Sequence, residues 1–403
     1  MSDLRLVAAL CLALVCATLS YSTFAALIPG FALVWDLSNT ESGVINGSFL
    51  AGYVVAVPLL VTLTDRVDPR RILLASLSIS ALSAAGFALF AEGFWSAIAL
   101  RLFGGVGLAG SYMPGMKVLS DRLRGHAQGR AVSCYAASFY LGLALSVLTT
   151  GWFAEAFGWR AAFAANAAES LAAALILVFA LPATATAPRV VRGHVLDFRP
   201  VLRNRRAMAY VFGYAGHNWE VIGFHGWVVA FLTFCLAREP IDSLALSATE
   251  ITTLLLFVSV PAAIFGNEIA RAFGRRLTLV ALMLLSAGVA LVLGFGAALP
   301  IYVVLALAGV YAATTAADSG GLTAGVVAAA EPGRVGATMA LHSTIGFLAG
   351  MLGPVSFGVL LDLTGGGQTV ASWGAGFAGL AGGVALGAVA VLVLARGTEG
   401  AAE

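Results

Sequence analysis

Residues 213–227, GYAGHNWEVIGFHGW, place two histidines and a glutamate inside the mostly apolar stretch 207–236. On a helix, His217 and Glu220 share a face, whereas His225 lies on the other side of His217 and is not expected to touch Glu220. Histidine titrates near neutral pH, and burial favours the protonated form of a carboxyl group. We therefore interpret His217 and Glu220 as a proton-coupling pair. The alternative is a structural hydrogen bond that orders a packed helix.

Four further ionisable residues interrupt other apolar stretches, namely Arg101, Glu169, Asp318 and His342. A charged residue at the bilayer centre costs about 2.5–3.5 kcal/mol on insertion scales, so each is expected to face a cavity or a partner. Asp318 lies in TTAADSGGLTAG, among small residues that leave room for water or ligand. We interpret Asp318 as a proton or cation site, with an interhelical hydrogen bond as the alternative. Glu169 joins the proton-coupling set, with a structural role as its alternative.

A second set of residues is predicted to bind the solute. Arg101 is permanently cationic, which suits it to receive a substrate carboxylate or to control the charge of a nearby acid. Its alternative is a buried ion pair with an aspartate or glutamate. The other members of this predicted set are Tyr21, His225, Trp227 and His342. The aromatic members have a simpler alternative, which is contact with lipid.

The composition requires these residues to be positioned by membrane helices. The chain has 403 residues, of which 60% are hydrophobic and 10% charged, whereas soluble domains carry roughly 25% charged residues. Apolar stretches long enough to span a bilayer occur near 6–34, 42–63, 71–92, 94–117, 129–153, 159–181, 207–236, 247–269, 276–297, 299–328, 335–361 and 370–395. We expect an all-α integral membrane protein with twelve transmembrane helices.

The first apolar stretch and the cysteines fit that class. The opening LRLVAALCLALVCATLS could imitate a secretory signal, but the apolar run continues to Val34, so we expect an uncleaved first helix. The four cysteines all fall in predicted spans without a CxxC spacing, and they indicate neither a disulfide framework nor a metal site. They are Cys11, Cys16, Cys134 and Cys235.

The arginines set the expected orientation, because cytoplasmic loops are enriched in lysine and arginine. The opposite set of loops holds only Arg160 and Arg238. We therefore expect both termini to be cytoplasmic, in a bacterial-type inner membrane. The arginines of the cytoplasmic loops are Arg66, Arg70, Arg71, Arg122, Arg124, Arg130, Arg189, Arg192, Arg199, Arg203, Arg205, Arg206, Arg271, Arg275, Arg276 and Arg334.

The polar, proline-containing segment 182–206 divides the spans into six and six, which predicts bundles at 1–181 and 207–403 joined by a cytoplasmic linker. The two halves contain similar sequence patterns. GWFAEAFG (151–158) and GVLLDLTG (358–365) share G-x-x-x-[E/D]-x-x-G. Two pseudo-symmetric bundles imply a solute path between them near mid-membrane.

Several motifs resemble those of the major facilitator superfamily. VTLTDRVDPRR (61–71) is similar to the family loop after the second helix, with Val61 and Asp68 at usual glycine positions, and GNEIARAFGRR (266–276) is similar to its second copy. RLFGGVGLAG and AFGWRAAF resemble a fourth-helix pattern and the junction before the sixth helix. The resemblance implies this family's fold and a cytoplasmic gate formed by Asp65, Arg66, Arg70, Arg71, Glu268, Arg275 and Arg276.

The hypothesis is a secondary transporter that moves a small polar organic solute, possibly an organic anion, by alternating access with proton coupling. The alternatives are an exporter of amphipathic drugs or toxic compounds and, third, a metal-ion transporter using His217, His225, His342 and Asp318. The fifth-helix glycine–proline pattern of drug–proton antiporters is missing from YLGLALSVLTTG. An integral-membrane enzyme or scaffold is a different class, and no nucleophile–base or metal constellation points to an enzyme.

The expected partners follow from this hypothesis. They are the small-molecule solute, protons and the lipid bilayer, with no nucleic acid, and the protein is expected to be a monomer. No cofactor is expected, and no G-x-x-x-x-G-K-[ST] motif for ATP hydrolysis occurs in the sequence.

Overall fold

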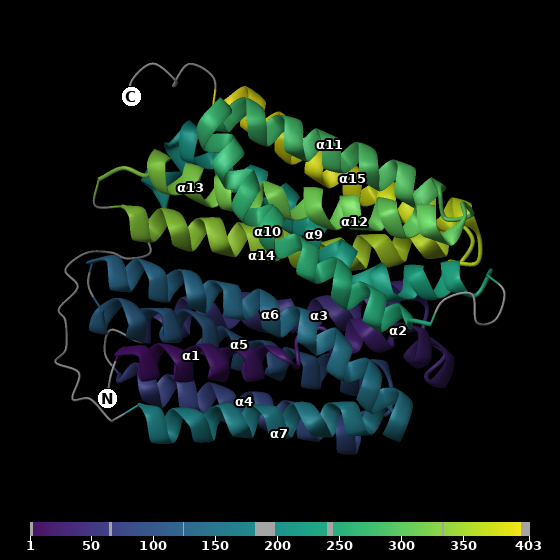
Figure 1. The fold of residues 1–403 in the computed structure, drawn as a ribbon, viewed down its shortest axis with the longest axis horizontal. Helices are drawn as coiled ribbons and strands as arrows, with labels where there is room; N and C mark the ends of the chain where they lie inside the picture. The colour runs from purple at the N-terminus through teal and green to yellow at the C-terminus, as the bar shows by residue number, and fades with distance from the viewer. Residues whose placement is uncertain are drawn as a thin grey trace. The chain divides into compact units, whose positions relative to one another are not determined.

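The computed structural model describes residues 3–63, 67–123, 125–181, 198–239, 245–332 and 334–395. Within these ranges the regular structure is helical, and twelve stretches are long and apolar enough to cross a membrane. Their ends agree with the predicted spans to within a few residues, so the expected all-α membrane fold is confirmed. The helices are drawn in Figure 1.

The helices before the central segment are α1 (Asp3–Thr18), α2 (Thr23–Val34), α3 (Asn39–Leu63), α4 (Pro69–Phe90), α5 (Phe94–Arg122), α6 (Gly125–Phe157) and α7 (Trp159–Ala180). Those after it are α8 (Arg199–Arg203), α9 (Arg205–Leu236), α10 (Ala248–Phe273), α11 (Arg275–Phe295), α12 (Ile301–Ala317), α13 (Ser319–Ala329), α14 (Val335–Leu363) and α15 (Val370–Leu394).

The described residues form two compact units. Unit 1 is drawn from Met1–Asp36, Ser48–Val191 and Thr249–Leu254, and unit 2 from Leu37–Gly47, Arg192–Ala248 and Leu255–Glu403. The beginning of α3 therefore belongs to unit 2, and the beginning of α10 to unit 1. Of the predicted linker 182–206, residues 182–197 lie outside the described residues. The predicted bundle boundaries stay a prediction.

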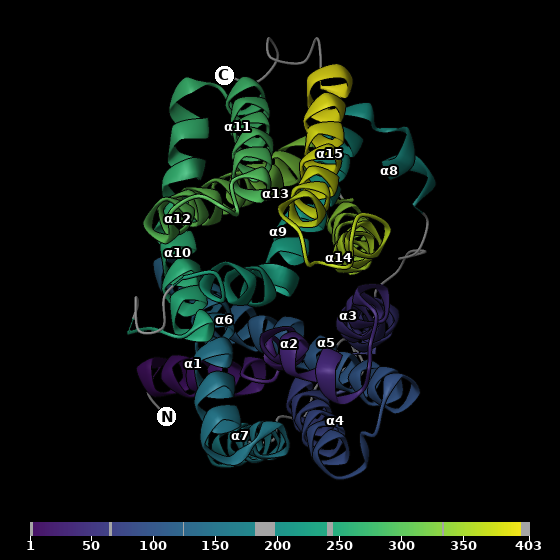
Figure 2. The same cartoon turned by 90° about the vertical axis from the view of Figure 1, so that its right-hand side faces the viewer.

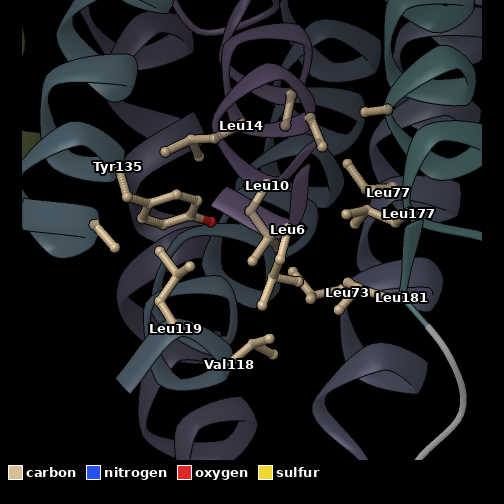
Figure 3. Packing of buried hydrophobic residues seen from close by; sticks show 14 of the residues in the cluster. Leu6, Leu10, Leu14, Leu73, Leu77, Val118, Leu119, Tyr135, Leu177 and Leu181 are labelled. Atoms are coloured by element: carbon tan, nitrogen blue, oxygen red, sulfur yellow. The ribbon is translucent and has the colours of Figure 1, made fainter. Parts of the chain in front are cut away.

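A leucine cluster holds the helices of unit 1 together. Leu6, Leu10 and Leu14 recur every four residues on α1 and therefore lie on one face of that helix. Figure 3 shows them between Tyr135 of α6 and the leucines of α4 and α7. Because lipid tails are as apolar as leucine, this cluster stabilises the bundle through close packing rather than through removal of apolar surface from water.

Glycines let α3 and α5 approach each other closely in unit 1. A Cβ atom added at Gly105 would lie 1.8 Å from the carbonyl oxygen of Phe49, and one at Gly52 would lie 2.0 Å from that of Leu102. Neither helix can accept a side chain at these contacts without moving. The glycine at position 105, which carried part of the resemblance to the fourth-helix pattern, is therefore required by packing.

Helix α9 is the centre of unit 2, where it packs against α14 and α15, as Figure 2 shows in end view. The α14 glycines of GFLAGMLGP allow this packing: a Cβ at Gly353 would lie 2.3 Å from the carbonyl oxygen of Trp219. The indole of Trp227 donates a 2.9 Å hydrogen bond to the carbonyl of Pro354. Close packing and this bond join α9 to α14.

The expected internal repeat is visible as one contact that occurs in each unit. In unit 1, Arg70 at the start of α4 donates a 3.0 Å hydrogen bond to the carbonyl of Val178 in the last turn of α7. In unit 2, Arg276 at the start of α11 donates a 3.2 Å bond to the carbonyl of Leu392 in the last turn of α15. Each arginine satisfies a helix C-terminal carbonyl and places positive charge at the negative end of the helix dipole.

The first turn of α3 is capped by a side chain from α14, within unit 2. Asp362 accepts hydrogen bonds from the backbone N–H and the side chain of both Asn39 and Thr40, at 2.6–3.1 Å. Unpaired N–H groups at a helix start need such an acceptor, and a carboxylate is favoured there by the helix dipole.

Replacing Gly105 with alanine is expected to lower the unfolding temperature of the detergent-purified protein, because overpacking forces α3 and α5 apart and costs about 1–3 kcal/mol. Gly288→Ala is the matched control: a Cβ at Gly288 meets nothing within 4 Å, and alanine favours helix over glycine. The unfolding temperature should fall for Gly105→Ala and should not fall for Gly288→Ala. Equal unfolding temperatures for the two variants would contradict the close contact.

Candidate functional site

The first span is interrupted in its middle. α1 ends at Thr18 and α2 begins at Thr23, so the single helix expected over 6–34 is wrong in this detail, although the span itself is confirmed. The interruption falls on the hydroxyl-rich run TLSYST (18–23). Serine and threonine hydroxyls compete for backbone hydrogen bonds and weaken helix interiors.

Polar side chains of other helices satisfy the interrupted backbone. Ser146 of α6 donates to the carbonyl of Leu19 and accepts a 3.0 Å bond from the N–H of Ser22. The Thr23 hydroxyl receives a 2.7 Å bond from the amide of Asn166 on α7. Released backbone groups at membrane depth are tolerated where the protein bonds them, as here, or where they line a water-filled cavity, because the hydrocarbon offers no water.

Arg101 of α5 bonds two further backbone carbonyls of the interruption. Its side chain is 4% exposed, and its guanidinium donates to the carbonyls of Ser20 at 3.3 Å and Tyr21 at 3.2 Å. The guanidinium carbon lies 4.3 Å from the ring centroid of Phe49, which adds a cation–π contact. Among the described residues, no carboxylate pairs with Arg101. The buried ion pair considered from the sequence is therefore absent there.

Unit 2 contains a second interruption, at Asp318, the residue between α12 and α13. The Asp318 carboxylate lies 2.7 Å from Nδ1 of His217 on α9, and both side chains are almost fully buried. Neither of these two atoms has a hydrogen bond of regular geometry. The distance is nevertheless that of an ion pair, which a protonated imidazole would form with a carboxylate.

Glu220 lies beside this pair and has a different direct partner. It is 0% exposed, and its Oε1 accepts a 2.9 Å hydrogen bond from Ser286 of α11. Its electrostatic neighbours are Asp318 and Tyr311, while its Oε2 and the Tyr311 hydroxyl have no hydrogen bond of regular geometry. His217 and Glu220 share a helix face, as predicted, but each binds another helix rather than its neighbour.

An aromatic stack extends the group toward α14. The Tyr214 ring lies 5.6 Å from that of His217 and 3.9 Å from that of His342, nearly parallel to both. We call His217, Glu220, Asp318, Ser286, Tyr311, Tyr214 and His342 the unit 2 polar cluster. Three of the four predicted proton-coupling residues and one predicted binding residue thus belong to one cluster.

The sequence interpretation missed three members of this cluster. Tyr311 precedes Asp318 by two helical turns, and this spacing was available as a signal. Ser286 is a single small polar residue in an apolar span, and Tyr214 is one aromatic residue among many. For these two, only the tertiary structure reveals the contact.

The remaining predicted residues lie elsewhere. Tyr21 contacts Phe49 and Phe139 edge to face in unit 1, and Glu169 is half-buried near Cys16, also in unit 1. His225 is half-buried on α9 without a hydrogen bond at Nε2. Trp227 is buried in the aromatic core of unit 2. Their proposed roles in binding or coupling stay predictions.

Metal ligation finds no support in the described part of the chain. No group of three or more histidine, cysteine, aspartate or glutamate side chains there is arranged to hold a metal ion. In the unit 2 polar cluster, the partners of the ionisable groups are each other, a serine and aromatic rings. This arrangement suits protons better than a metal ion.

The family model described as Major Facilitator Superfamily matches residues 10–238, more than half of the chain. The chain belongs to the major facilitator superfamily. The relatives and solved structures compared below are named as transporters. The family assignment agrees with the resemblance found in the sequence motifs.

Two curated relatives are similar over part of their length. A probable sphingolipid transporter, spinster homologue 2 of Arabidopsis thaliana, is 33% identical over 133 residues, which are 32% of this chain and 26% of that protein. A probable 4-methylmuconolactone transporter of Cupriavidus pinatubonensis is 26% identical over 190 residues, 46% of this chain and 41% of that protein. The chain thus spans less than half the length of these relatives.

Solved structures of the superfamily share the fold over nearly the whole chain. A bacterial homologue of the human lysosomal transporter Spinster, in an inward-facing and unoccupied conformation, matches with a TM-score of 0.77 at 15% identity, covering 98% of this chain and 95% of that one. A D-xylose–proton symporter matches with a TM-score of 0.75 at 16% identity, covering 98% of each chain. At these identities the likeness establishes the fold alone.

The superfamily's loop motifs are partly described. Asp65 and Arg66 lie outside the described residues. Asp68, at a usual glycine position, caps α4 by accepting a 2.9 Å bond from the N–H of Arg70, with Pro69 in the first turn. A proline-led helix start with an aspartate cap needs no glycine there.

In the second copy of the loop motif, Glu268 forms an exposed ion pair with Arg271 on the same helix, at 2.9 Å. An exposed pair of this kind contributes little stability. Arg275 and Arg276 begin α11, and Arg71 lies exposed on α4. The gate role of all seven loop residues stays a prediction.

Ser146→Ala is expected to lower the unfolding temperature, because it leaves the N–H of Ser22 unpaired in the interrupted first span at a cost of about 1–3 kcal/mol. Ser138→Ala is the matched control on the same helix, since the Ser138 hydroxyl donates to the carbonyl of Cys134 one turn earlier, inside a continuous helix. Thermal unfolding in detergent compares the two. If both variants unfold at the temperature of the wild type, the Ser146 side chain does not stabilise the interruption.

Proposed function

We propose that this chain is a proton-coupled secondary transporter that moves a small polar organic solute by alternating access. The family and the relatives support solute transport. Proton coupling rests on the unit 2 polar cluster, and above all on one observation: the His217–Asp318 contact at a helix interruption, with Glu220 beside it. Transporter ion sites are commonly built at such discontinuous helices.

The cluster can hold a variable number of protons. His217, Asp318 and Glu220 are ionisable residue types, their side chains are nearly inaccessible, and two of them are carboxylic acids. Deprotonating Glu220 would place a second carboxylate charge near Asp318 without a second cation. Loss or gain of that proton then follows the access of water or solute to the cluster.

A proton gradient is sufficient to drive accumulation. One pH unit supplies about 1.4 kcal/mol and 100 mV supplies about 2.3 kcal/mol per charge. No cofactor enters this scheme. We propose a monomer in a bacterial-type inner membrane, consistent with the twelve spans and the arginine distribution.

For the solute we favour an organic anion. Arg101 is a buried cation without a carboxylate partner in the described part of unit 1. The similarity to a probable 4-methylmuconolactone transporter supports the same class, because muconolactones carry a carboxylate. A second candidate solute is an amphipathic compound, favoured by the similarity to probable sphingolipid transporters.

Glu220→Gln is expected to abolish gradient-driven accumulation but to preserve counterflow, because glutamine imitates the protonated acid and keeps its size. The solute is selected first from organic anions, including 4-methylmuconolactone, and sphingolipids by thermal shift of the purified protein. Uptake under an imposed pH step and counterflow without a gradient are then measured in proteoliposomes. Asp318→Asn should behave similarly, and His217→Ala should shift the pH dependence.

Ser138→Ala serves as the control variant, since it lies in unit 1 and its hydroxyl donates to a carbonyl of its own helix. All variants are checked for folding by size-exclusion chromatography. Accumulation at the wild-type level in Glu220→Gln would remove this residue as the coupling site. A wild-type protein that exchanges no selected solute in proteoliposomes would argue against transport itself.

The orientation proposal predicts that residue 190 is cytoplasmic. In a variant whose four native cysteines are replaced by alanine, Val190→Cys should react with a membrane-impermeant maleimide only after cells are permeabilised. Glu239→Cys, on the opposite loop, should react in intact cells. The reversed labelling pattern would place both termini outside.

A further inference from the structure

No carboxylate balances the charge of Arg101 in the described part of unit 1. Arg101 is the only buried lysine or arginine among the described residues. Its acceptors are two neutral carbonyls at 3.2 and 3.3 Å, longer than the roughly 2.7–2.9 Å of strong charge-assisted bonds. Its Nε has no hydrogen-bond partner among the described residues. A buried ion without a counter-charge is costly, and an anion from outside the chain would supply that counter-charge.

Aromatic rings continue from this guanidinium. Phe49 lies under it, Tyr21 contacts Phe49 at 5.5 Å, Phe139 contacts Tyr21 at 6.2 Å, and Tyr112 contacts Phe139 at 5.1 Å between ring centroids. We call Phe49, Tyr21, Phe139 and Tyr112 the aromatic row. They come from α3, the interrupted first span, α6 and α5.

The rings of the aromatic row are not sealed in a core. Phe49 is buried, whereas Tyr21, Phe139 and Tyr112 are each half-buried. Adjacent rings of the row meet edge to face or tilted. One face of Tyr112 is covered by the parallel ring of Tyr135, 5.9 Å away between centroids, so a further flat group would contact the remaining half-exposed ring surface of the row. A cation at one end and flat apolar surface along the rest define the complementary ligand.

We propose that Arg101 and the aromatic row bind a planar organic monocarboxylate, aromatic or conjugated, as the transported solute. This inference rests on the proposed function and specifies its substrate class. The guanidinium fork pairs with the two carboxylate oxygens, and the rings contact the flat hydrocarbon. One cation balances one negative charge, which favours a carboxylate over a doubly charged phosphate.

The helix interruption also belongs to this proposal. The carboxylate competes with the carbonyls of Ser20 and Tyr21 for the same guanidinium hydrogens. Occupancy of the site therefore weakens the two bonds that Arg101 makes to the backbone between α1 and α2. Ligand binding would therefore change the hydrogen bonding of the first span at its interruption between α1 and α2.

The test measures equilibrium binding of four probes to the purified full-length protein by titration calorimetry. Cinnamate is planar and singly charged, cinnamamide is planar and neutral, 3-cyclohexylpropionate is charged but not flat, and phenyl phosphate is flat with a higher charge. Cinnamate is expected to bind at least tenfold more tightly than each of the other three. Equal binding of cinnamamide, or no saturable binding of cinnamate, overturns the proposal.

Variants assign the binding to these residues. Arg101→Gln should weaken cinnamate at least tenfold and leave cinnamamide unchanged, and Arg101→Lys should lose part of the affinity because it lacks the fork. Tyr21→Leu and Phe139→Leu should reduce the preference for cinnamate over 3-cyclohexylpropionate. Phe179→Leu, 85% exposed on α7, is the matched control and should bind as wild type.

The aromatic variants keep the test decisive if Arg101→Gln does not fold. An unchanged preference in both Tyr21→Leu and Phe139→Leu would contradict the aromatic row. The outcomes also separate this inference from the proposed function. Proton-driven transport of a neutral solute alone would overturn the substrate class and leave the function standing. Cinnamate binding without exchange in proteoliposomes would leave the binding site standing and overturn its role in transport.

Discussion

The constraint on which this structure depends is the absence of water in the hydrocarbon of the bilayer. Every backbone group released from a helix and every charged side chain must there find a partner in the protein, in a ligand or in a water-filled cavity. Two spans are nevertheless interrupted. The first is completed by Arg101 and Ser146, whose side chains bond the released backbone. The other has Asp318 at its break, facing His217. In each unit, an ionisable side chain from a neighbouring helix lies at the place where regular structure stops.

The two units repeat one architecture but differ in chemistry. The matching contacts of Arg70 and Arg276 with the last turn of a neighbouring helix follow the duplicated six-span pattern. The interruptions do not follow it, since they occur in the first span of unit 1 and the fourth span of unit 2. Unit 1 thus presents a cation toward neutral carbonyls, and unit 2 presents two acids and an imidazole. The repeated contacts thus belong to the scaffold, whereas the interruptions differ between the units in their position and side chains.

The spans were predictable from the sequence because apolar length is a strong signal, and the family followed from short motifs. The side-chain contacts between helices were less predictable from the sequence. Helical spacing shows that His217 and Glu220 share a face, but it does not show which neighbour each one meets, and the contact of His217 with Asp318 bridges residues about a hundred positions apart in the chain. The hydroxyls of TLSYST signalled the first interruption, yet the surrounding apolar residues indicated a continuous helix. Ser286 gave no signal at all, because a buried serine is common in membrane helices.

The composition of the unit 2 polar cluster restricts how it can hold protons. His217, Asp318 and Glu220 are together neutral when two protons are shared among the three side chains, whether His217 and Glu220 hold them or the two acids do. A third proton leaves a net positive charge and a single proton leaves a net negative charge, and both are costly without water. By this count of charges, the proposed coupling mechanism would keep two protons in the dry cluster, and a change in that number would need hydration or a solute charge nearby. His217 faces Asp318, whereas Glu220 accepts a bond from Ser286 of α11. In the proposed mechanism, a proton that moves between His217 and Glu220 would therefore change how strongly α9 is held by each of these neighbours.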